Sequence, residues 1–188
     1  MNLTCFKAYD IRGKLGEDLN AEIARRIGRA YADVMAVGSV IVGHDARESS
    51  PVLKAALVEG LRTGGVNVTD IGLCGSEEVY FATGHLHKGG GIMVTASHNP
   101  IDYNGMKMVG PGSRPLDPAT EMKAIKTAAE RDSYQDHPHY GTYAEANPRN
   151  GLAAHVAGMV DGRSLQGLHV VANAGNGTAG ATFDAVVA

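Results

Sequence analysis

Short runs of β-branched residues that end at glycine alternate, along this chain, with stretches whose apolar residues recur at helical spacing. This alternation predicts repeated strand–helix–strand units, which fold into a mostly parallel sheet covered by helices. The predicted strands are 39–43, 66–71, 91–95 and, at a sheet edge, 105–109. The predicted helices are 18–35, one opened by Ser49 or Ser50 and closed by Gly64-Gly65, one opened by Ser76, and 120–131. The expected fold class is therefore α/β.

The composition changes after the last of these helices, and the change suggests a boundary between two units. Residues 1–131 form a complete α/β domain, and 132–150, rich in Asp, His, Pro and Asn, are typical of a linker. Residues 151–188 then offer a helix over 152–160, a strand over 168–172 and a glycine turn into a last helix. One strand and two helices are too few to form a sheet, so we expect the beginning of a second, truncated domain.

Charge and composition exclude some classes of partner. The chain of 188 residues has a net charge of −3 and no Trp, which argues against a nucleic-acid binder. No stretch approaches the roughly 20 apolar residues of a membrane span, and the first residues lack the pattern of a signal peptide. Cys5 and Cys74 lie far apart and have no metal-ligand spacing. We expect a cytoplasmic protein with no nucleic-acid or membrane partner.

The segment Thr95–Pro100 is the strongest candidate for chemistry. It directly follows a predicted buried strand, and ligands of open α/β sheets gather beyond the carboxyl ends of strands. Small residues and Pro100 would present the hydroxyl of Ser97 on a constrained loop, with the imidazole of His98 beside it. No G-x-S-x-G motif is present, so carrying a phosphoryl group suits this serine better than hydrolysis does. The alternative is a turn in which Ser97 only bonds to backbone.

Other polar segments each have a functional and a purely structural interpretation. Arg12 lies in Ala8–Gly13 and could grip phosphate, or it could be a surface arginine in a turn. Lys107 follows a turn close to the serine loop and could offset phosphate charge or move a proton, or it could be solvated. For Asp45 and Arg47 we favour a structural pair.

Taken together, these motifs resemble the α-D-phosphohexomutases, and most closely the bacterial phosphomannomutase branch of the GDP-mannose pathway. The resemblance covers nearly the whole chain and rests on three motifs in order: Ala8-Tyr9-Asp10-Ile11-Arg12-Gly13, Thr95-Ala96-Ser97-His98-Asn99-Pro100 and Asp102-Tyr103-Asn104-Gly105-Met106-Lys107. Leu3–Lys7 and Glu77–Thr83 fit the same branch.

The resemblance implies reversible transfer of a phosphoryl group between the 6- and 1-positions of a phosphohexose, here mannose 6-phosphate and mannose 1-phosphate. Ser97 would carry the phosphoryl group, and a bisphosphorylated sugar would be the intermediate and activator. His98, Lys107 and Arg12 would assist catalysis, while Tyr9, Arg12 and Asn99 would contact the phosphosugar substrate.

The resemblance also implies magnesium, with the phosphate on Ser97 as one ligand. The family takes its aspartate ligands from an Asp-Gly-Asp-x-Asp loop in the second domain, and this sequence contains no such motif. Relatives are more than twice as long. We therefore expect a fragment that has the nucleophile but little or no mutase turnover by itself.

Several alternatives remain open. A phosphoglucomutase of the same family is one, and a non-catalytic interaction fragment, with apolar surface that could drive a homodimer, is another. The turn Gly175–Gly180 matches G-x-G-x-x-G after a predicted strand, which would suit a dinucleotide-binding module. The pairs His85/His87 and His137/His139 are interpreted as solvated loop histidines, because no zinc-ligand set accompanies them.

Overall fold

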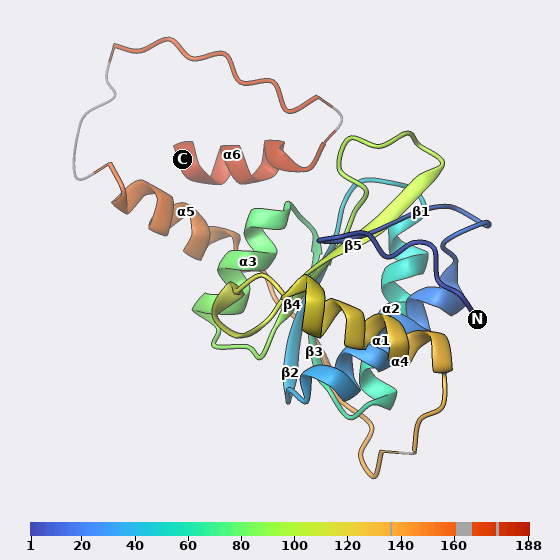
Figure 1. Ribbon diagram of the computed structural model, residues 1–188. Coiled ribbons are helices and arrows are strands. Elements are labelled where there is room, and N and C mark those ends of the chain that lie inside the picture. Colours follow the sequence, from blue (N-terminus) through green and yellow to red (C-terminus); the bar gives the residue numbers. More distant parts are fainter. Residues whose placement is uncertain (136, 161–166, 176) are drawn as a thin grey trace.

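The computed structural model describes residues 1–135, 137–160, 167–175 and 177–188, and it contains a six-stranded mixed sheet (Figure 1). The strand order is β1-β5-β4-β2-β3-β6. The strands are β1 (Ile11–Lys14), β2 (Ser39–His44), β3 (Asn67–Leu73), β4 (Gly91–Val94), β5 (Tyr103–Val109) and β6 (Tyr143–Glu145). The pairs β2–β3, β2–β4 and β3–β6 are parallel, whereas β5 runs antiparallel to both β1 and β4. The expected α/β class is thus confirmed, with an antiparallel end to the sheet.

The helices are α1 (Ala21–Met35), α2 (Ser50–Thr63), α3 (Ser76–His85), α4 (Lys123–Arg131), α5 (Arg149–Gly158) and α6 (Ala179–Val187). A short 3₁₀ turn, Pro111–Ser113, and a π-helical turn, Pro118–Met122, precede α4. No helix among the described residues is long and apolar enough to cross a membrane.

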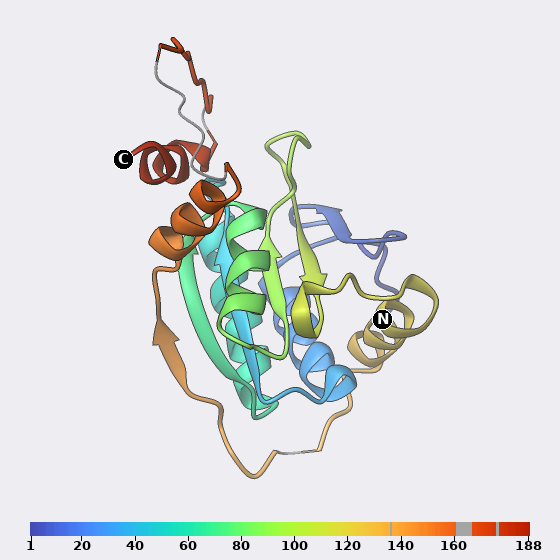
Figure 2. The same cartoon turned by 90° about the vertical axis from the view of Figure 1, so that its left-hand side faces the viewer.

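Alternate residues of the central strands feed two separate cores. Val40 and Val42 of β2 pack into the larger one, which α1, α2 and α4 close over one face of the sheet. Ile41, between them, points to the opposite face and packs in a smaller core with Val79 of α3 and Met93 of β4. This two-sided burial explains why β2 is a continuous apolar run rather than an alternating one. Figure 2 shows α3 lying against its face of the sheet.

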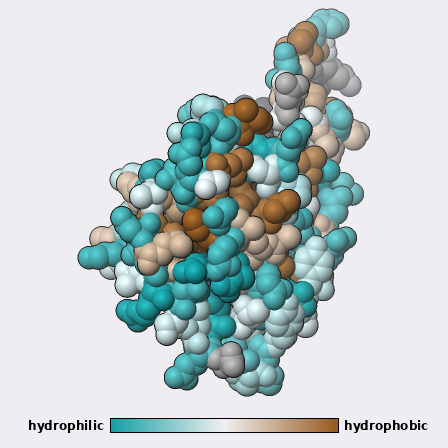
Figure 3. All heavy atoms as spheres, turned by 90° about the vertical axis from the view of Figure 1, so that its right-hand side faces the viewer, coloured by the Kyte–Doolittle hydropathy of each residue, from teal (hydrophilic) through white to brown (hydrophobic). Residues whose placement is uncertain are grey.

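The surface seen from the right of Figure 1 is mixed in character. Apolar residues gather near the middle of this face and polar side chains surround them (Figure 3).

The position of β5 differs from the expectation. The sequence places 105–109 at a sheet edge, but β1 pairs along its outer side, with Arg12 opposite Gly105. A Cβ added at Gly105 would lie 1.9 Å from the carbonyl oxygen of Ile11, so the two strands approach this closely only because Gly105 has no side chain. The strand Ile11–Lys14 was missed because four residues with a central glycine give too short a pattern to detect.

Two helix caps also differ from the expectation. Ser49 occupies the position before α2 but makes no capping bond, and Ser50 lies inside the helix. The residue before α3 is Gly75, not Ser76, and the Glu78 side chain accepts its backbone N–H at 3.1 Å. Near α2, the hydroxyl of Ser49 accepts a hydrogen bond from Asn104 and that of Ser50 donates to Asp45. At α3, the side chain that caps the helix is that of Glu78.

The segment expected to be a linker is partly ordered into the sheet. Within 132–150, β6 pairs with β3, and α5 already begins at Arg149. Residues 168–172, expected as a strand, are irregular, and Val171 is 97% exposed. A strand needs a hydrogen-bonded neighbour, and none of the described residues pairs with this segment.

A buried carboxylate connects the later helices to α3. Glu78 is only 1% exposed and forms an ion pair with Arg149 of α5 at 3.1 Å. It also accepts a hydrogen bond of 2.7 Å from the Thr182 hydroxyl of α6. Three elements distant in sequence therefore meet at one charged group.

Candidate active site

The serine loop connects β4 to β5 and holds Ser97 in a strained conformation. Ser97 has a φ of 54°, in the left-handed region that is costly for a residue with a Cβ, and its side chain is exposed. Its backbone N–H donates to the Thr95 hydroxyl at 2.9 Å, and the N–H of Asn99 closes a turn onto the Ala96 carbonyl at 3.0 Å. The loop therefore presents the Ser97 hydroxyl outward from a fixed backbone, as the sequence predicts.

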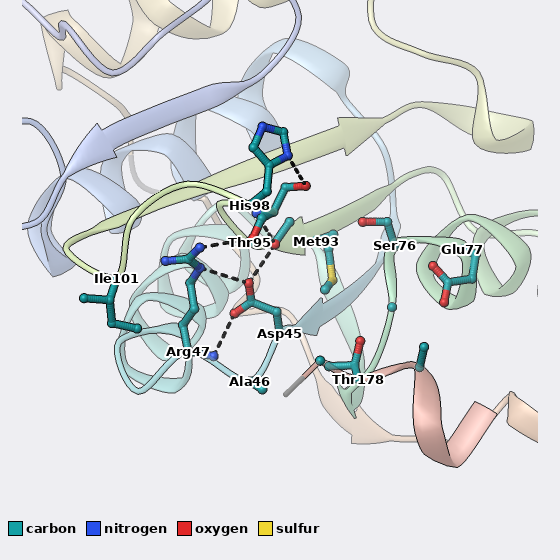
Figure 4. Close-up of a pocket in the computed structure, with 14 residues that line it drawn as sticks. Asp45, Ala46, Arg47, Ser76, Glu77, Met93, Thr95, His98, Ile101 and Thr178 are labelled. Carbon is teal, nitrogen blue, oxygen red and sulfur yellow. Dashed lines mark hydrogen bonds and ion pairs between the residues drawn. The ribbon is translucent and has the colours of Figure 1, made fainter. Parts of the chain in front are cut away.

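Below the loop, the carboxylate of Asp45 collects hydrogen bonds from three directions. It accepts from the Thr95 hydroxyl at 2.7 Å, from the Ser50 hydroxyl at 2.5 Å and from the backbone N–H of Arg47 at 3.1 Å. The Arg47 side chain lies 3.5 Å away (Figure 4), so the predicted Asp45–Arg47 pair is confirmed. Asp45 is thereby tied to the backbone N–H of Ser97 through a single hydroxyl.

Arg47 makes further contacts that the sequence did not reveal. Its guanidinium donates to four backbone carbonyls, those of Ser97, Asn99 and Pro100 in the serine loop and that of Tyr103 at the start of β5. Its position directly after β2, and beside the carboxyl end of β4, is the signal that could have indicated this role.

Arg12 approaches the same loop from the other side. One of its terminal nitrogens donates to the Ala96 carbonyl at 2.6 Å and to the Asn99 amide oxygen at 2.5 Å, and the other pairs with Asp10 at 3.0 Å. Its Nε is buried and has no partner among the described residues. Arg12 is thus a largely buried side chain bound to the loop and not a surface arginine in a turn.

His98 is exposed and adjoins the Ser97 hydroxyl. Its Nδ1 lies 3.4 Å from the Ser97 oxygen, and the ring points away from the Asp45 carboxylate (Figure 4). The structure therefore brings Arg12 of β1 together with Ser97, His98 and Asn99 of the serine loop.

Two of the predicted residues line a neighbouring cavity instead. Lys107 and Tyr9 face a cavity of about 410 Å³ that Asp10 and Tyr80 also line. Burial, and after it the charge of Glu77, raises the pKa of the Tyr80 phenol. Lys107 extends from the same face of the sheet as Arg12, because Gly105, opposite Arg12, is two residues before it on β5. Lys107 and Arg12 therefore extend from one side of the sheet, and Arg12 is the one that bonds to the serine loop.

The cavity beside Ser97 has a volume of about 630 Å³ and opens between the serine loop and the first turn of α3. Ser76, Glu77 and Thr178 contribute polar groups to its wall, and Met93 contributes an apolar one (Figure 4). Cys74 lies beneath Met93 and is buried, and burial raises the pKa of its thiol to about 12. The thiol therefore stays protonated, and the hydroxyl groups that line this cavity are those of Ser97, Ser76, Thr95 and Thr178.

Among the described residues, no group of three or more His, Cys, Asp or Glu side chains is arranged to hold a metal ion. The carboxylate of Asp45, which lines the cavity beside Ser97, already accepts three hydrogen bonds from the protein. The part of the chain that the structure describes does not supply the donor set of a magnesium site by itself.

The glycine turn 175–180 does not have the context of a dinucleotide site. It leads into α6, but the described residues directly before it, 168–172, are irregular, so they do not form the strand of the strand–turn–helix unit that such a motif requires.

Comparisons with known proteins identify the family of the chain. Residues 4–136 match the family model described as phosphoglucomutase/phosphomannomutase, alpha/beta/alpha domain I. Over 188 residues, the chain is 49% identical to a phosphomannomutase of Escherichia coli, an alignment that covers 99% of this chain and 42% of the relative. It is 47% identical to a protein named phosphohexose mutases from Xanthomonas campestris, covering 98% of this chain and 41% of that protein.

A solved structure is similar as well. A phosphoglucomutase/phosphomannomutase family protein from Burkholderia thailandensis superposes with a TM-score of 0.83 at 34% identity, over 97% of this chain and 42% of that one. The chain thus spans about two fifths of the length of these relatives. Because the family model matches most of its residues, the chain belongs to the phosphoglucomutase/phosphomannomutase family.

Proposed function

We propose that this chain supplies the phosphoryl-carrying serine of a phosphomannomutase, and that Ser97 is that residue. The whole protein would interconvert mannose 6-phosphate and mannose 1-phosphate through a bisphosphorylated sugar, in the service of carbohydrate biosynthesis. The observation that carries the proposal is the exposed hydroxyl of Ser97 on a strained and tightly bonded loop at the edge of a polar cavity. Strain of this kind is maintained where function requires a side chain in one direction.

The proposed transfer exchanges one phosphorus–oxygen bond for another. A sugar hydroxyl attacks the phosphoryl group on Ser97, the bond from phosphorus to the serine oxygen breaks, and the proton of the hydroxyl leaves to a base. The serine oxygen takes up a proton, and the reverse reaction with the other phosphate of the sugar restores the phosphoserine. Such a transfer depends mainly on positioning and on neutralising charge.

The cationic side chains around the loop suit that requirement. Arg12 is largely buried, and its Nε has no hydrogen-bond partner among the described residues. This Nε could donate to a phosphate without breaking an existing hydrogen bond. His98, 3.4 Å from the serine oxygen, can hold or pass a proton there. Lys107 and Tyr9 border the next cavity on the same side of the sheet and would bind the sugar phosphate, with Asn99 at the loop itself.

The identity of the sugar, the compartment and the domain boundaries belong to the same proposal. Mannose phosphates are favoured because curated relatives at 47–49% identity are named phosphomannomutases, and glucose phosphates are the alternative. The unpaired thiols of Cys5 and Cys74 suit a reducing cytoplasm. Residues 1–131 would be the first domain, with 132–150 leading to a second that begins at 151.

Magnesium is part of the proposal only through the family resemblance. A phosphate on Ser97 would be one ligand, but the described residues lack the remaining donors. The proposed phosphoryl transfer therefore rests on Ser97 and on the cationic side chains around its loop.

The test is the transfer of one phosphate to Ser97. The chain is incubated with a hexose 1,6-bisphosphate and its intact mass is followed, with peptide mapping to locate the modification. We expect one added phosphate at Ser97 in the native chain and none in Ser97→Ala. Ser133→Ala is the matched control, because Ser133 is also an exposed serine but lines neither of the two cavities. Equal phosphorylation of the Ser97→Ala variant would exclude Ser97 as the carrier.

A further inference from the structure

We propose that Arg47 is a positioning residue that fixes the backbone of the serine loop and thereby sets the rate at which Ser97 is phosphorylated. The inference rests on the proposed role of Ser97 but assigns Arg47 no contact with substrate. It concerns a side chain whose sequence pattern indicated only an ion pair with Asp45.

The carbonyls that Arg47 binds extend from Ser97 to the first residue of β5. Its Nη1 donates to Pro100 at 2.8 Å and to Tyr103 at 3.0 Å. Its Nη2 donates to Ser97 at 3.1 Å and to Asn99 at 2.5 Å. These four acceptors occupy all four hydrogens of the two terminal nitrogens. The group is thus saturated by backbone, and it is placed to hold the loop rather than to grip a phosphate.

The guanidinium is also well enclosed. The Arg47 side chain is 11% exposed, and its Nε faces the carboxylate of Asp45 at 3.5 Å. Burial strengthens hydrogen bonds to a charged donor because water competes with them less. Asp45 also restrains the position of Arg47, because its carboxylate accepts the backbone N–H of the same residue.

Both peptide groups of Ser97 are held by this pair. The carbonyl of Ser97 accepts from Arg47, and its N–H donates to the Thr95 hydroxyl, which itself donates to Asp45. A left-handed serine costs on the order of 1 kcal/mol and persists only when its surroundings impose it. Arg47 and Asp45 are the groups that impose this conformation, and the conformation sets the direction of the Ser97 hydroxyl.

Lysine cannot replace this arrangement. An ammonium is a point donor with three hydrogens, whereas the guanidinium is a planar fork that reaches four carbonyls at once. Arg47→Lys therefore keeps the charge beside Asp45 and loses most of the bonds to the loop, and Arg47→Ala loses both.

The matched control is Arg62→Lys. Arg62 also donates to a backbone carbonyl, that of Gly141 at 2.8 Å, and lies over the ring of Tyr140. It makes the same type of contact outside the serine loop, so it reports the general cost of exchanging arginine for lysine.

Two measurements test the proposal on the folded chain, after urea unfolding has shown that each variant is folded. The first is amide hydrogen exchange at Ser97, Asn99 and Tyr103, whose N–H groups are bonded within the loop. We expect these amides to exchange at least tenfold faster in Arg47→Lys, and faster still in Arg47→Ala. Hydrogen exchange needs no substrate, so it tests the positioning role of Arg47 by itself. If no phosphate reaches Ser97 in the native chain, that result refutes only the proposed function.

The second measurement is the rate of phosphorylation of Ser97 by a hexose 1,6-bisphosphate. A displacement of about 1 Å at a reacting group costs on the order of 10²-fold in rate, so we expect a decrease of roughly 10- to 100-fold in Arg47→Lys and none in Arg62→Lys. Native exchange rates in the loop of Arg47→Ala would overturn the proposal. If the native chain accepts phosphate, a second result would also overturn the proposal. This result is an Arg47→Lys variant whose loop amides exchange faster but whose Ser97 is phosphorylated at the native rate.

Discussion

The close crossing of α1 and α2 depends on glycines, and replacing Gly60 by alanine tests how rigid that crossing is. A Cβ added at Gly60 would lie 2.0 Å from the carbonyl oxygen of Arg25 and 2.8 Å from the backbone nitrogen of Arg29. Both atoms belong to the backbone of α1, so no side-chain rotation can relieve the contact. Gly28 of α1 faces α2 in the same way, with its added Cβ 2.2 Å from the Leu57 carbonyl oxygen.

The size of the effect follows from these distances. Ordinary contact begins at 3.4 Å, so Gly60→Ala would have to move the helices apart by about 1.4 Å at this point. Overpacking in a well-packed core costs about 1–3 kcal/mol, and alanine returns at most ~1 kcal/mol through its higher helix propensity. Because the obstacle is backbone, we take the upper part of the range and expect a net loss of about 2 kcal/mol.

Urea unfolding followed by circular dichroism measures this loss. With an m-value of about 2 kcal/mol/M, the midpoint should fall by about 1 M in Gly60→Ala. Gly84→Ala in α3 is the control, because the nearest atom to its added Cβ is 3.7 Å away, an ordinary contact. The control should unfold at the same or a slightly higher urea concentration. An unchanged or raised midpoint for Gly60→Ala would refute the reasoning that the two backbones cannot separate without cost.

Two further predictions concern charged groups. Arg149→Met should lower the free energy of unfolding by about 2 kcal/mol. This is below the ~3–5 kcal/mol lost when a fully buried pair is broken, because Arg149 is 22% exposed. Glu78→Gln should lower the free energy of unfolding by less, because it leaves no unpaired buried charge. Urea midpoints of the two variants compare them, and a larger loss for the glutamine variant would contradict this account. The hydrogen bond from Arg114 lowers the pKa of Glu121 from 4.5 to about 2, so this carboxylate stabilises the fold above pH 4.5 and loses that effect as the pH falls toward 2. Glu121→Gln should therefore reduce the dependence of unfolding free energy on pH between 7 and 3, by no more than ~1 kcal/mol since the arginine is half-exposed, and an identical pH profile would show that the pair contributes nothing.

The sequence predicted the central parallel strands and their helices well, because the strands are continuous apolar runs and the helices carry apolar residues at helical spacing. The apolar run of β2 and the spacing of α1 both led to elements within a few residues of those observed. The prediction from sequence was wrong for segments that are strands only if a neighbouring strand is available for hydrogen bonding. β1 and β6 are three or four residues long and become strands only because β5 and β3 offer them hydrogen bonds, whereas 168–172 has a strand-like composition and no partner.

For the candidate site, the side chains proposed to carry chemistry could be predicted from the sequence, but the side chains that hold the loop could not. Ser97 and His98 are adjacent on the chain, so their association needs no tertiary information. The contacts of Arg47 join residues about fifty positions apart, and its acceptors are backbone carbonyls, which every residue has. No residue pattern records such an arrangement, and the register of β2 against β4 creates it.

The pairing of β1 with β5 also makes the position of Arg12 depend on distant parts of the chain. More than eighty residues separate Arg12 from its strand partner Gly105 and from its acceptors in the serine loop. The parallel strands β2, β3 and β4 pair with one another without β1, whereas β1 pairs with β5 alone among the described strands. A change that weakens the pairing of β1 with β5 therefore removes the Arg12 guanidinium from the loop of Ser97 and leaves the pairing of the central strands in place.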